Sequence, residues 1–513
     1  MPTDSQYPQN ITVEDLERLL VNDERVKVAG LDIDGVLRGK ILVKSKFFST
    51  LKSGFGFCSV VFGWDLHDKV YTEPGIEFAA ETTGYPDLIA RVDLSTFRRI
   101  PWENDVPFFL LTFYDPKSPE EPLYCCPRGL LRRVLQGYQE LGLEPYVGTE
   151  FEFFNFNETP ETLAAKNHIS PSPLTPGMFG YSLLRPTLNQ AFYYDVFDSL
   201  QKFGVEIEGW HTETGPGVYE AAIAYTSALE AADRAALFKT SVKQLGILRH
   251  GVLPSFMAKP HNHLPGCSGH LHFSIRETAT GRNVFAVTES DESMEAKTGE
   301  DAFADETVGM SSVMRSFLGG VLRGLPSCMA VLAPTVNSLC VSVSPCALPN
   351  YKNFHVCVIV VHEPSTSYKR LVENYWAPVT VSWGIDNRIA AVRVISPPIC
   401  SASATRMEVR VTGADINPHL AIATILACGL WGIRENLAIP IAPLGHPASE
   451  GKGERLARSL FEAIIKMDDA GSVARRVLGD RFVDHFVKTR KHEWNIWETA
   501  VTEWEVRRYM ELI

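Results

Sequence analysis

Charged and apolar side chains alternate along several short segments of this chain. The six residues from Arg406 to Val411 read RMEVRV, so that every second residue is apolar. Side chains of a β-strand point to opposite faces in turn. A strand at this place would bury its three apolar side chains in a core and would present two arginines and a glutamate as one row on the other face.

Three other segments repeat this design with glutamate and histidine. The pairs are Glu150 with Glu152, His270 with His272, and His211 with Glu213, which Glu220 follows seven residues later. An alternating strand is most often the solvated face of an antiparallel sheet, but a solvated face needs neither histidines nor paired glutamates. Carboxylates, imidazoles and guanidiniums carried together are suited to a hard divalent cation that is bound with phosphate.

The composition of the chain is that of an ordinary soluble globular protein. Its 513 residues are enough for two or more domains. Of them, 45% are hydrophobic and 21% are charged. The net charge of −12 argues against general binding of nucleic acid. No apolar run reaches the ~20 residues of a membrane span, and the polar start of the chain lacks a signal-peptide pattern. With ten cysteines at irregular spacing, these features predict a cytoplasmic protein with reduced thiols.

The first 115 residues predict a small α+β domain. Thr12 is suited to cap a helix that carries Leu16, Leu19 and Leu20. The expected strands are Val26 to Asp32, Val36 to Val43, Phe57 to Phe62 and Phe108 to Phe113. Pro116, Pro119 and Pro122 indicate a linker to a larger domain, which we expect to span residues 120–513.

The larger domain is expected to mix helices with antiparallel strands. The strand candidates are the alternating segments above, with the first extending from Val147 to Phe156. The helix candidates are Pro127 to Leu141, Ala221 to Leu248, Ser312 to Leu325, and most of the chain after Glu454. The chain contains no glycine-rich phosphate-binding loop, so metal ions and arginines would have to hold the phosphates of any nucleotide.

Five motifs resemble those of glutamine synthetases, in the same order along the chain. They are GTEFEFF (148–154), WHTETGPGVYE (210–220), the segment from Lys259 to His272, the segment from Asn387 to Arg393, and RMEVR (406–410). The resemblance covers nearly the whole chain. It implies an α+β fold with an N-terminal β-grasp domain and a catalytic domain built on a curved antiparallel sheet. It also implies a ring-shaped homo-oligomer, with two stacked hexamers as the expected form.

The resemblance assigns roles to individual residues. Glu152, Glu213 and Glu220 match the ligands of one divalent metal, and Glu150, His270 and Glu408 match those of a second. The positions that contact phosphate or act in catalysis are Arg388, Arg393, Arg406 and His272. The positions that hold substrate are Gly266, Arg370, Arg410 and Trp376, and those near the nucleotide are Glu208 and Ser274 with Arg393 and Arg406.

The implied reaction is the ATP-dependent joining of glutamate to an amine. ATP converts the γ-carboxyl of glutamate into an acyl phosphate, while two or three Mg²⁺ or Mn²⁺ ions and the arginines neutralise the phosphates. The amine then displaces inorganic phosphate. A catalytically silent relative would be expected to lose metal ligands, and a metal-dependent hydrolase would not need the arginines.

The first departure from the family concerns the amine. Relatives that use ammonia carry a glutamate in the flap where this chain has Trp376, and they carry an aspartate in a segment that here reads CSVVFGW (58–64). Asp65 and Asp68 follow closely and are candidates to replace that aspartate. A larger amine, such as a primary alkylamine or polyamine, would bring apolar surface to Trp376 and Phe57. Ammonia remains the alternative acceptor.

The second departure is an insertion of 29 residues, from Leu339 to Ser367. Deleting it joins PTVNS (334–338) to YKRL (368–371) and restores an uninterrupted family motif that contains Arg370. The segment lacks the patterning of its surroundings. Two explanations remain open, a retained intron in the gene model and a genuine surface loop of this lineage. In either case we expect the segment to lie outside the main sheet.

Overall fold

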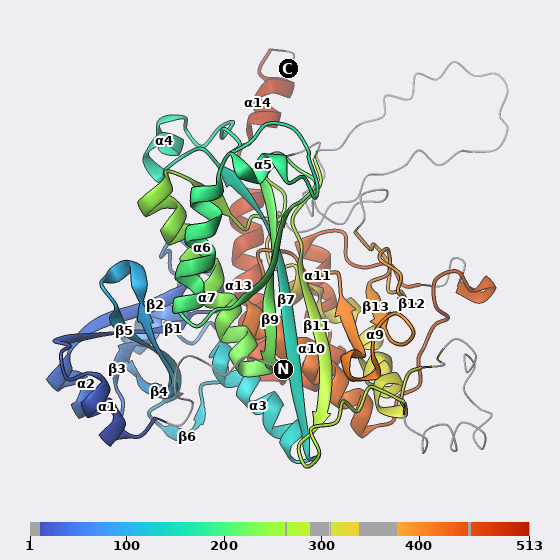
Figure 1. The fold of residues 1–513 in the computed structure, drawn as a ribbon, viewed down its shortest axis with the longest axis horizontal. Helices are drawn as coiled ribbons and strands as arrows, with labels where there is room; N and C mark the ends of the chain where they lie inside the picture. The colour runs from blue at the N-terminus through green and yellow to red at the C-terminus, as the bar shows by residue number, and fades with distance from the viewer. Residues whose placement is uncertain are drawn as a thin grey trace.

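The computed structural model describes residues 11–261, 264–287, 307, 309–337, 377–449 and 453–511. It contains two sheets, one near the N-terminus and one at the centre of the molecule (Figure 1). Helices cover the central sheet and fill the region behind it. This arrangement confirms the predicted α+β class. The segment from Leu339 to Ser367 lies outside the described residues.

The first sheet has the strand order β2-β1-β5-β4-β3, with β6 added beside β5. β1 and β5 are parallel, and the other pairs are antiparallel. The strands are β1 (Arg25–Leu31), β2 (Leu37–Val43), β3 (Phe55–Cys58), β4 (Asp87–Ile100), β5 (Val106–Asp115) and β6 (Ser118–Pro122). Helices α1 (Val13–Leu19) and α2 (Lys44–Thr50) accompany them, and Thr12 caps α1 through a reciprocal bond with Asp15.

The second sheet has the order β12-β13-β14-β11-β7-β9-β8, with β10 beside β7. Only the pair β12 and β13 is parallel. The strands are β7 (Leu143–Phe156), β8 (Ile207–Thr212), β9 (Val218–Ser227), β10 (Leu253–Ser255), β11 (Gly269–Glu277), β12 (Trp383–Ile385), β13 (Val392–Ile395) and β14 (Arg406–Val409). The long strands β7, β9 and β11 run side by side through the middle of the molecule (Figure 1).

The helices of the second part pack against this sheet and against one another. Helix α7 packs on β7 and β9, and helix α10, which is almost wholly buried, packs against α3, α7 and α9. The helices are α3 (Pro127–Gln139), α4 (Pro160–Ala165), α5 (Leu184–Thr187), α6 (Gln190–Lys202), α7 (Ala228–Leu245), α9 (Ser312–Leu332), α10 (Pro418–Arg434), α11 (Leu460–Asp468), α12 (Val473–Leu478), α13 (Asp480–Glu498) and α14 (Glu503–Tyr509). None of the described helices is both long and apolar enough to cross a membrane.

A buried ion cluster joins three of these helices. Asp233 of α7 accepts two hydrogen bonds from Arg128 of α3, at 2.7 and 2.8 Å, and lies 2.8 Å from Nε2 of His419 in α10. The side chains of Arg128 and Asp233 are each 1% exposed. Although burial opposes ionisation, the Arg128 guanidinium holds the pKa of Asp233 well below its usual range.

Three predictions of local structure are wrong. Residues 221–227, predicted as the start of a helix, belong to β9, because pairing with β7 and β8 outweighs the helix propensity of their alanines. The predicted strand from Phe57 to Phe62 ends at Cys58 and continues as a 3₁₀ helix. The proline-rich stretch predicted as a linker forms β6, whose prolines are tolerated because it is an edge strand.

Candidate active site

The register of the second sheet brings the alternating segments together. Glu150 of β7 lies opposite His270 of β11, while Glu152 of β7 lies opposite Glu220 of β9. Glu220 in turn lies opposite His211 of β8. Because the Cβ atoms of such partners are about 5 Å apart, residues from four strands form one continuous polar surface.

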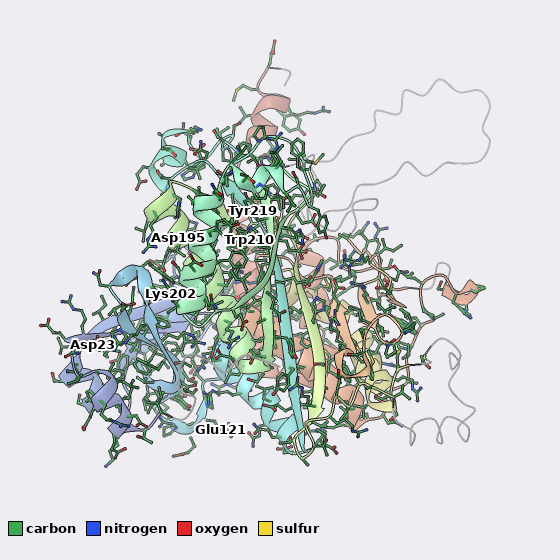
Figure 2. All side chains as sticks on the ribbon, in the orientation of Figure 1. Asp23, Glu121, Asp195, Lys202, Trp210 and Tyr219 are labelled. Carbon is green, nitrogen blue, oxygen red and sulfur yellow. The ribbon has the colours of Figure 1, made fainter. Side chains whose placement is uncertain are left out.

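Strand β14 extends this surface as its alternation predicts. Met407 and Val409 are fully buried. Glu408 points the other way, where it lies opposite His272 of β11 and Arg393 of β13. Along β8 and β9, the apolar residues Trp210 and Tyr219 pack together with their ring centroids 5.4 Å apart, and Figure 2 labels both. Apolar packing thus holds the strands that present the polar row.

The first cluster of metal-type ligand atoms consists of Glu150, His270 and Glu408, all within 4.8 Å of one another. Nδ1 of His270 lies 3.4 Å from Oε1 of Glu408 and 3.6 Å from Oε2 of Glu150. Burial opposes ionisation of Glu150, but hydrogen bonds from His270 and His272 outweigh it and hold the pKa of this carboxyl below its ordinary value. These are the three residues predicted to share one metal.

The second cluster consists of His211, Glu213 and Glu220. Nε2 of His211 lies 3.5 Å from a carboxylate oxygen of Glu220, and Nδ1 lies 4.0 Å from Glu213. The prediction named Glu152 in place of His211. The structure turns the Glu152 carboxylate toward Ser268, which donates through its backbone N–H at 2.9 Å and through its hydroxyl. The sequence already indicated this histidine, because His211 precedes Glu213 by two residues and would share its face of a strand.

Glu220 has the most perturbed carboxyl of the second cluster. Burial raises its pKa, and the neighbouring carboxylates of Glu152, Glu150 and Glu213 raise it further, to about 9. Only 13% of the side chain is exposed. The three neighbouring carboxylates thus oppose ionisation of Glu220, and a bound divalent cation would offset that repulsion. The donor set and its charge therefore fit a metal ion.

A cavity of about 390 Å³ adjoins the first cluster. Its walls include Glu150, His272 and Arg406, together with both residues predicted to lie near the nucleotide, Glu208 and Ser274. The Nε of Arg406 donates to Nδ1 of His272 at 3.3 Å, and the Arg406 side chain is half-buried. The volume lies within the usual range for a small-molecule pocket.

The other arginines differ in their surroundings. Arg393 donates to Glu408 at 2.9 Å and to Asp386, and Arg410 is buried and also donates to Glu408. Arg388 is exposed in the turn between β12 and β13. The structure therefore brings Arg393, Arg406 and Arg410 to the polar surface. Burial raises the pKa of Tyr181, whose ring stacks on His211 of the second cluster, and Arg388 lies close enough to oppose that rise.

The remaining predicted residues divide into two groups. Gly266 is half-buried in the loop that leads into β11. Arg370 and Trp376 lie outside the described residues, so their predicted substrate contacts remain predictions.

Three residues of the expected acceptor region lie in the described part of the chain, and one expectation, for Phe57, is corrected. Asp65 accepts from the backbone N–H groups of His67 and Lys69 in its own loop, and Asp68 accepts from Arg38 of β2, so both carboxylates already have partners. Their role at the acceptor site stays a prediction. Phe57 is buried in the core around the first sheet, where its ring lies 5.3 Å from that of Phe113. It therefore has little apolar surface to offer to a substrate.

Comparison with known proteins gives a consistent result. The family model described as "Glutamine synthetase, catalytic domain" matches residues 124–298, 290–354 and 351–509. The "Type-1 glutamine synthetase 2" of Dictyostelium discoideum is 44% identical over 492 residues, which is 95% of this chain and 84% of that protein. The glutamate–isopropylamine ligase of a Pseudomonas species is 31% identical and covers 96% of both chains.

Further similarities extend to another amine ligase and to solved structures. A γ-glutamylethanolamide synthetase of Streptomyces coelicolor is 30% identical over 97% of this chain and 96% of its own. A solved complex of GmaS with ADP has a TM-score of 0.72 at 25% identity, covering 98% of this chain and 99% of its own. The structure of GmaS without ligand has a TM-score of 0.73 at 24% identity, over the same shares of the two chains, and shows the same fold.

Proposed function

Because this chain belongs to the glutamine synthetase family of ATP-dependent glutamate–amine ligases, we propose that it joins the γ-carboxyl of glutamate to a primary amine. The reaction would pass through a γ-glutamyl phosphate. The observation that carries the proposal is the single polar surface on which two ligand clusters, three arginines and a cavity meet.

We assign the first metal to Glu150, His270 and Glu408. The second is assigned to Glu213 and Glu220, with His211 or Glu152 completing its ligands. Bound Mg²⁺ or Mn²⁺ would neutralise phosphate charge and orient the transfer of the phosphoryl group. Cross-strand pairing holds these side chains in place on a rigid sheet, which supports the assignment.

The arginines and the cavity support a nucleotide site beside the first cluster. A nucleotide in the cavity would lie next to Arg406, whose planar guanidinium can hold a phosphate through two hydrogen bonds. Arg393 and Arg410 now pair with Glu408. When Glu408 binds a metal ion, these pairs would weaken and leave both guanidiniums able to contact the anionic substrates. Arg370 and Gly266 would hold glutamate.

The acceptor is proposed to be a primary amine or polyamine rather than ammonia. Desolvating an ammonium ion requires carboxylates close by. Trp376 replaces one acidic residue that relatives use. The candidates for the other, Asp65 and Asp68, already accept hydrogen bonds from His67 and from Arg38. One relative is named for joining glutamate to isopropylamine, and another for making γ-glutamylethanolamide. Ammonia remains the second candidate, because the relative with 44% identity is named as a glutamine synthetase.

A phosphate-release assay tests this proposal. The protein, with and without residues 339–367, would be supplied with glutamate, ATP and Mg²⁺, and with ammonia or one of several primary amines. We expect a higher kcat/KM for at least one primary amine than for ammonia. A clear preference for ammonia would make this a true glutamine synthetase. No release with any acceptor, with or without the insertion, would indicate a catalytically silent relative. The predicted double-hexameric ring would be measured on the same samples by light scattering.

A further inference from the structure

A second cavity, of about 730 Å³, lies between the first sheet and the helices of the larger part. Its wall is formed by the β1–β2 turn around Asp34, by α7 at Lys239 and Lys243, and by α13 at Phe486 and Arg490. Most of the other residues around it are apolar. Such a cavity has the size and character of a site for a small organic molecule.

Two lysines reach this cavity from the same side of α7. Lys239 and Lys243 are four residues apart, so their side chains lie one turn apart on one face of the helix. The Nζ atoms lie 5.5 and 5.6 Å from the centre of the Phe256 ring. Both ammonium groups therefore meet at the same part of the wall.

Among the described residues, no carboxylate forms an ion pair with either lysine. Lys239 donates to the backbone carbonyl of Ile416 at 2.7 Å, which carries no net charge. Burial and the ammonium of Lys243 lower the pKa of Lys239 to about 7, although Asp415 opposes this effect, and burial also lowers the pKa of Lys243. Asp415 therefore offsets the charge of Lys239 only in part, and Lys243 has no carboxylate partner among the described residues.

The other charged groups of the cavity wall are engaged elsewhere. Asp34 accepts a hydrogen bond from Arg490, and Asp415 accepts one from the Thr335 hydroxyl at 2.6 Å. Arg490 thus neutralises Asp34, whereas Asp415 keeps its charge and offsets only part of the charge of the two lysines. An external anion would supply the missing charge, and its apolar part would cover the apolar wall.

We propose that this cavity binds a small organic anion, with its carboxylate or phosphate between Lys239 and Lys243 and its apolar body against Phe256. The site would be separate from the candidate active site. Phe256 packs against Phe151 and Phe153 at centroid distances of 6.1 and 5.0 Å. These rings alternate with the ligand carboxylates along β7, so the cavity lies behind the strand that presents them.

The proposal is tested with two probes that have the same apolar body and differ in charge. Binding of 4-phenylbutyrate and of its neutral amide to the full-length protein would be measured by calorimetry. We expect the acid to bind roughly tenfold more tightly or better, because it forms charge-assisted hydrogen bonds. In Lys239→Gln and Lys243→Gln this preference should disappear. Lys243→Arg, which keeps the charge, and Lys117→Gln, at an exposed lysine outside the cavity, should retain it.

Three outcomes would overturn the proposal. They are equal affinity of the acid and the amide for the unaltered protein, a preference for the acid that persists in both glutamine variants, and the absence of saturable binding. Lys243 is the more exposed of the two lysines, so Lys243→Gln keeps the test valid if replacement of Lys239 prevents folding.

Discussion

Replacing Glu220 with glutamine should make the metal-free protein more stable and the metal-bound protein less so. Glu220 has an ordinary pKa of 4.5, which burial and three neighbouring glutamates raise to about 9 in the folded chain. At pH 7 the carboxyl is therefore ionised in the unfolded chain and protonated in the folded one. Because its folded pKa is raised, its contribution to stability is complete below pH 4.5 and is lost as the pH rises toward 9.

The size of this effect follows from the interval between pKa 4.5 and pH 7. Each pH unit corresponds to about 1.36 kcal/mol. Because Glu220 must take up a proton when the chain folds at pH 7, the free energy of unfolding is about 3 kcal/mol lower than it would be without this cost. The glutamine of Glu220→Gln has no proton to take up. In the absence of metal, the variant should therefore gain up to this much free energy of unfolding. The gain should shrink toward pH 5 and grow toward pH 9. A metal at a hundredfold excess over its Kd stabilises a protein by about 2.7 kcal/mol, and the variant should lose much of that gain.

Thermal unfolding with EDTA and with Mn²⁺, at pH 5, 7 and 9, measures both effects. Glu17→Gln, at an exposed glutamate of α1, is the matched control and should behave as the unaltered protein does. If the metal-free Glu220→Gln variant unfolds at or below the temperature of the unaltered protein, the repulsion argument is wrong. If Mn²⁺ raises both unfolding temperatures equally, Glu220 is not a ligand.

Three further predictions address other parts of the molecule. Arg406→Lys keeps the charge but loses the planar fork beside the cavity, and should lower kcat/KM by roughly 100-fold in the phosphate-release assay; full activity would remove Arg406 from the mechanism. Asp233→Asn leaves the buried Arg128 cation without its main partner and should reduce the free energy of unfolding by about 3–5 kcal/mol in denaturant titrations, and a loss below 1 kcal/mol would contradict this. Trp376→Glu should raise the ratio of kcat/KM for ammonia to that for a primary amine, and an unchanged ratio would exclude Trp376 from acceptor selection.

Local patterns predicted two strands that carry the site and misjudged a third. The strand around Glu150 and the strand of His270 and His272 were expected from period-two alternation, and both exist as β7 and β11. Residues 221–227 were misjudged because Ala221, Ala222 and Ala224 favour a helix, while two neighbouring strands bind this segment as β9. Local propensity contains no information about such long-range pairing.

The sequence by itself determined which residue types face together and, through five ordered motifs, which family the chain belongs to. In a strand, residues two apart point to the same face, so Glu150 must lie on the same face as Glu152, and Arg406 on the same face as Glu408. Only the tertiary structure decided which of these residues come within a few ångströms of one another. His211 rather than Glu152 lies in the second ligand cluster, because strand register and the bond to Ser268 set those distances. The lysines of the second cavity were not recognised from the sequence for the same reason. The wall of that cavity is formed by a turn, two helices and the Phe256 ring, which come from separate parts of the chain.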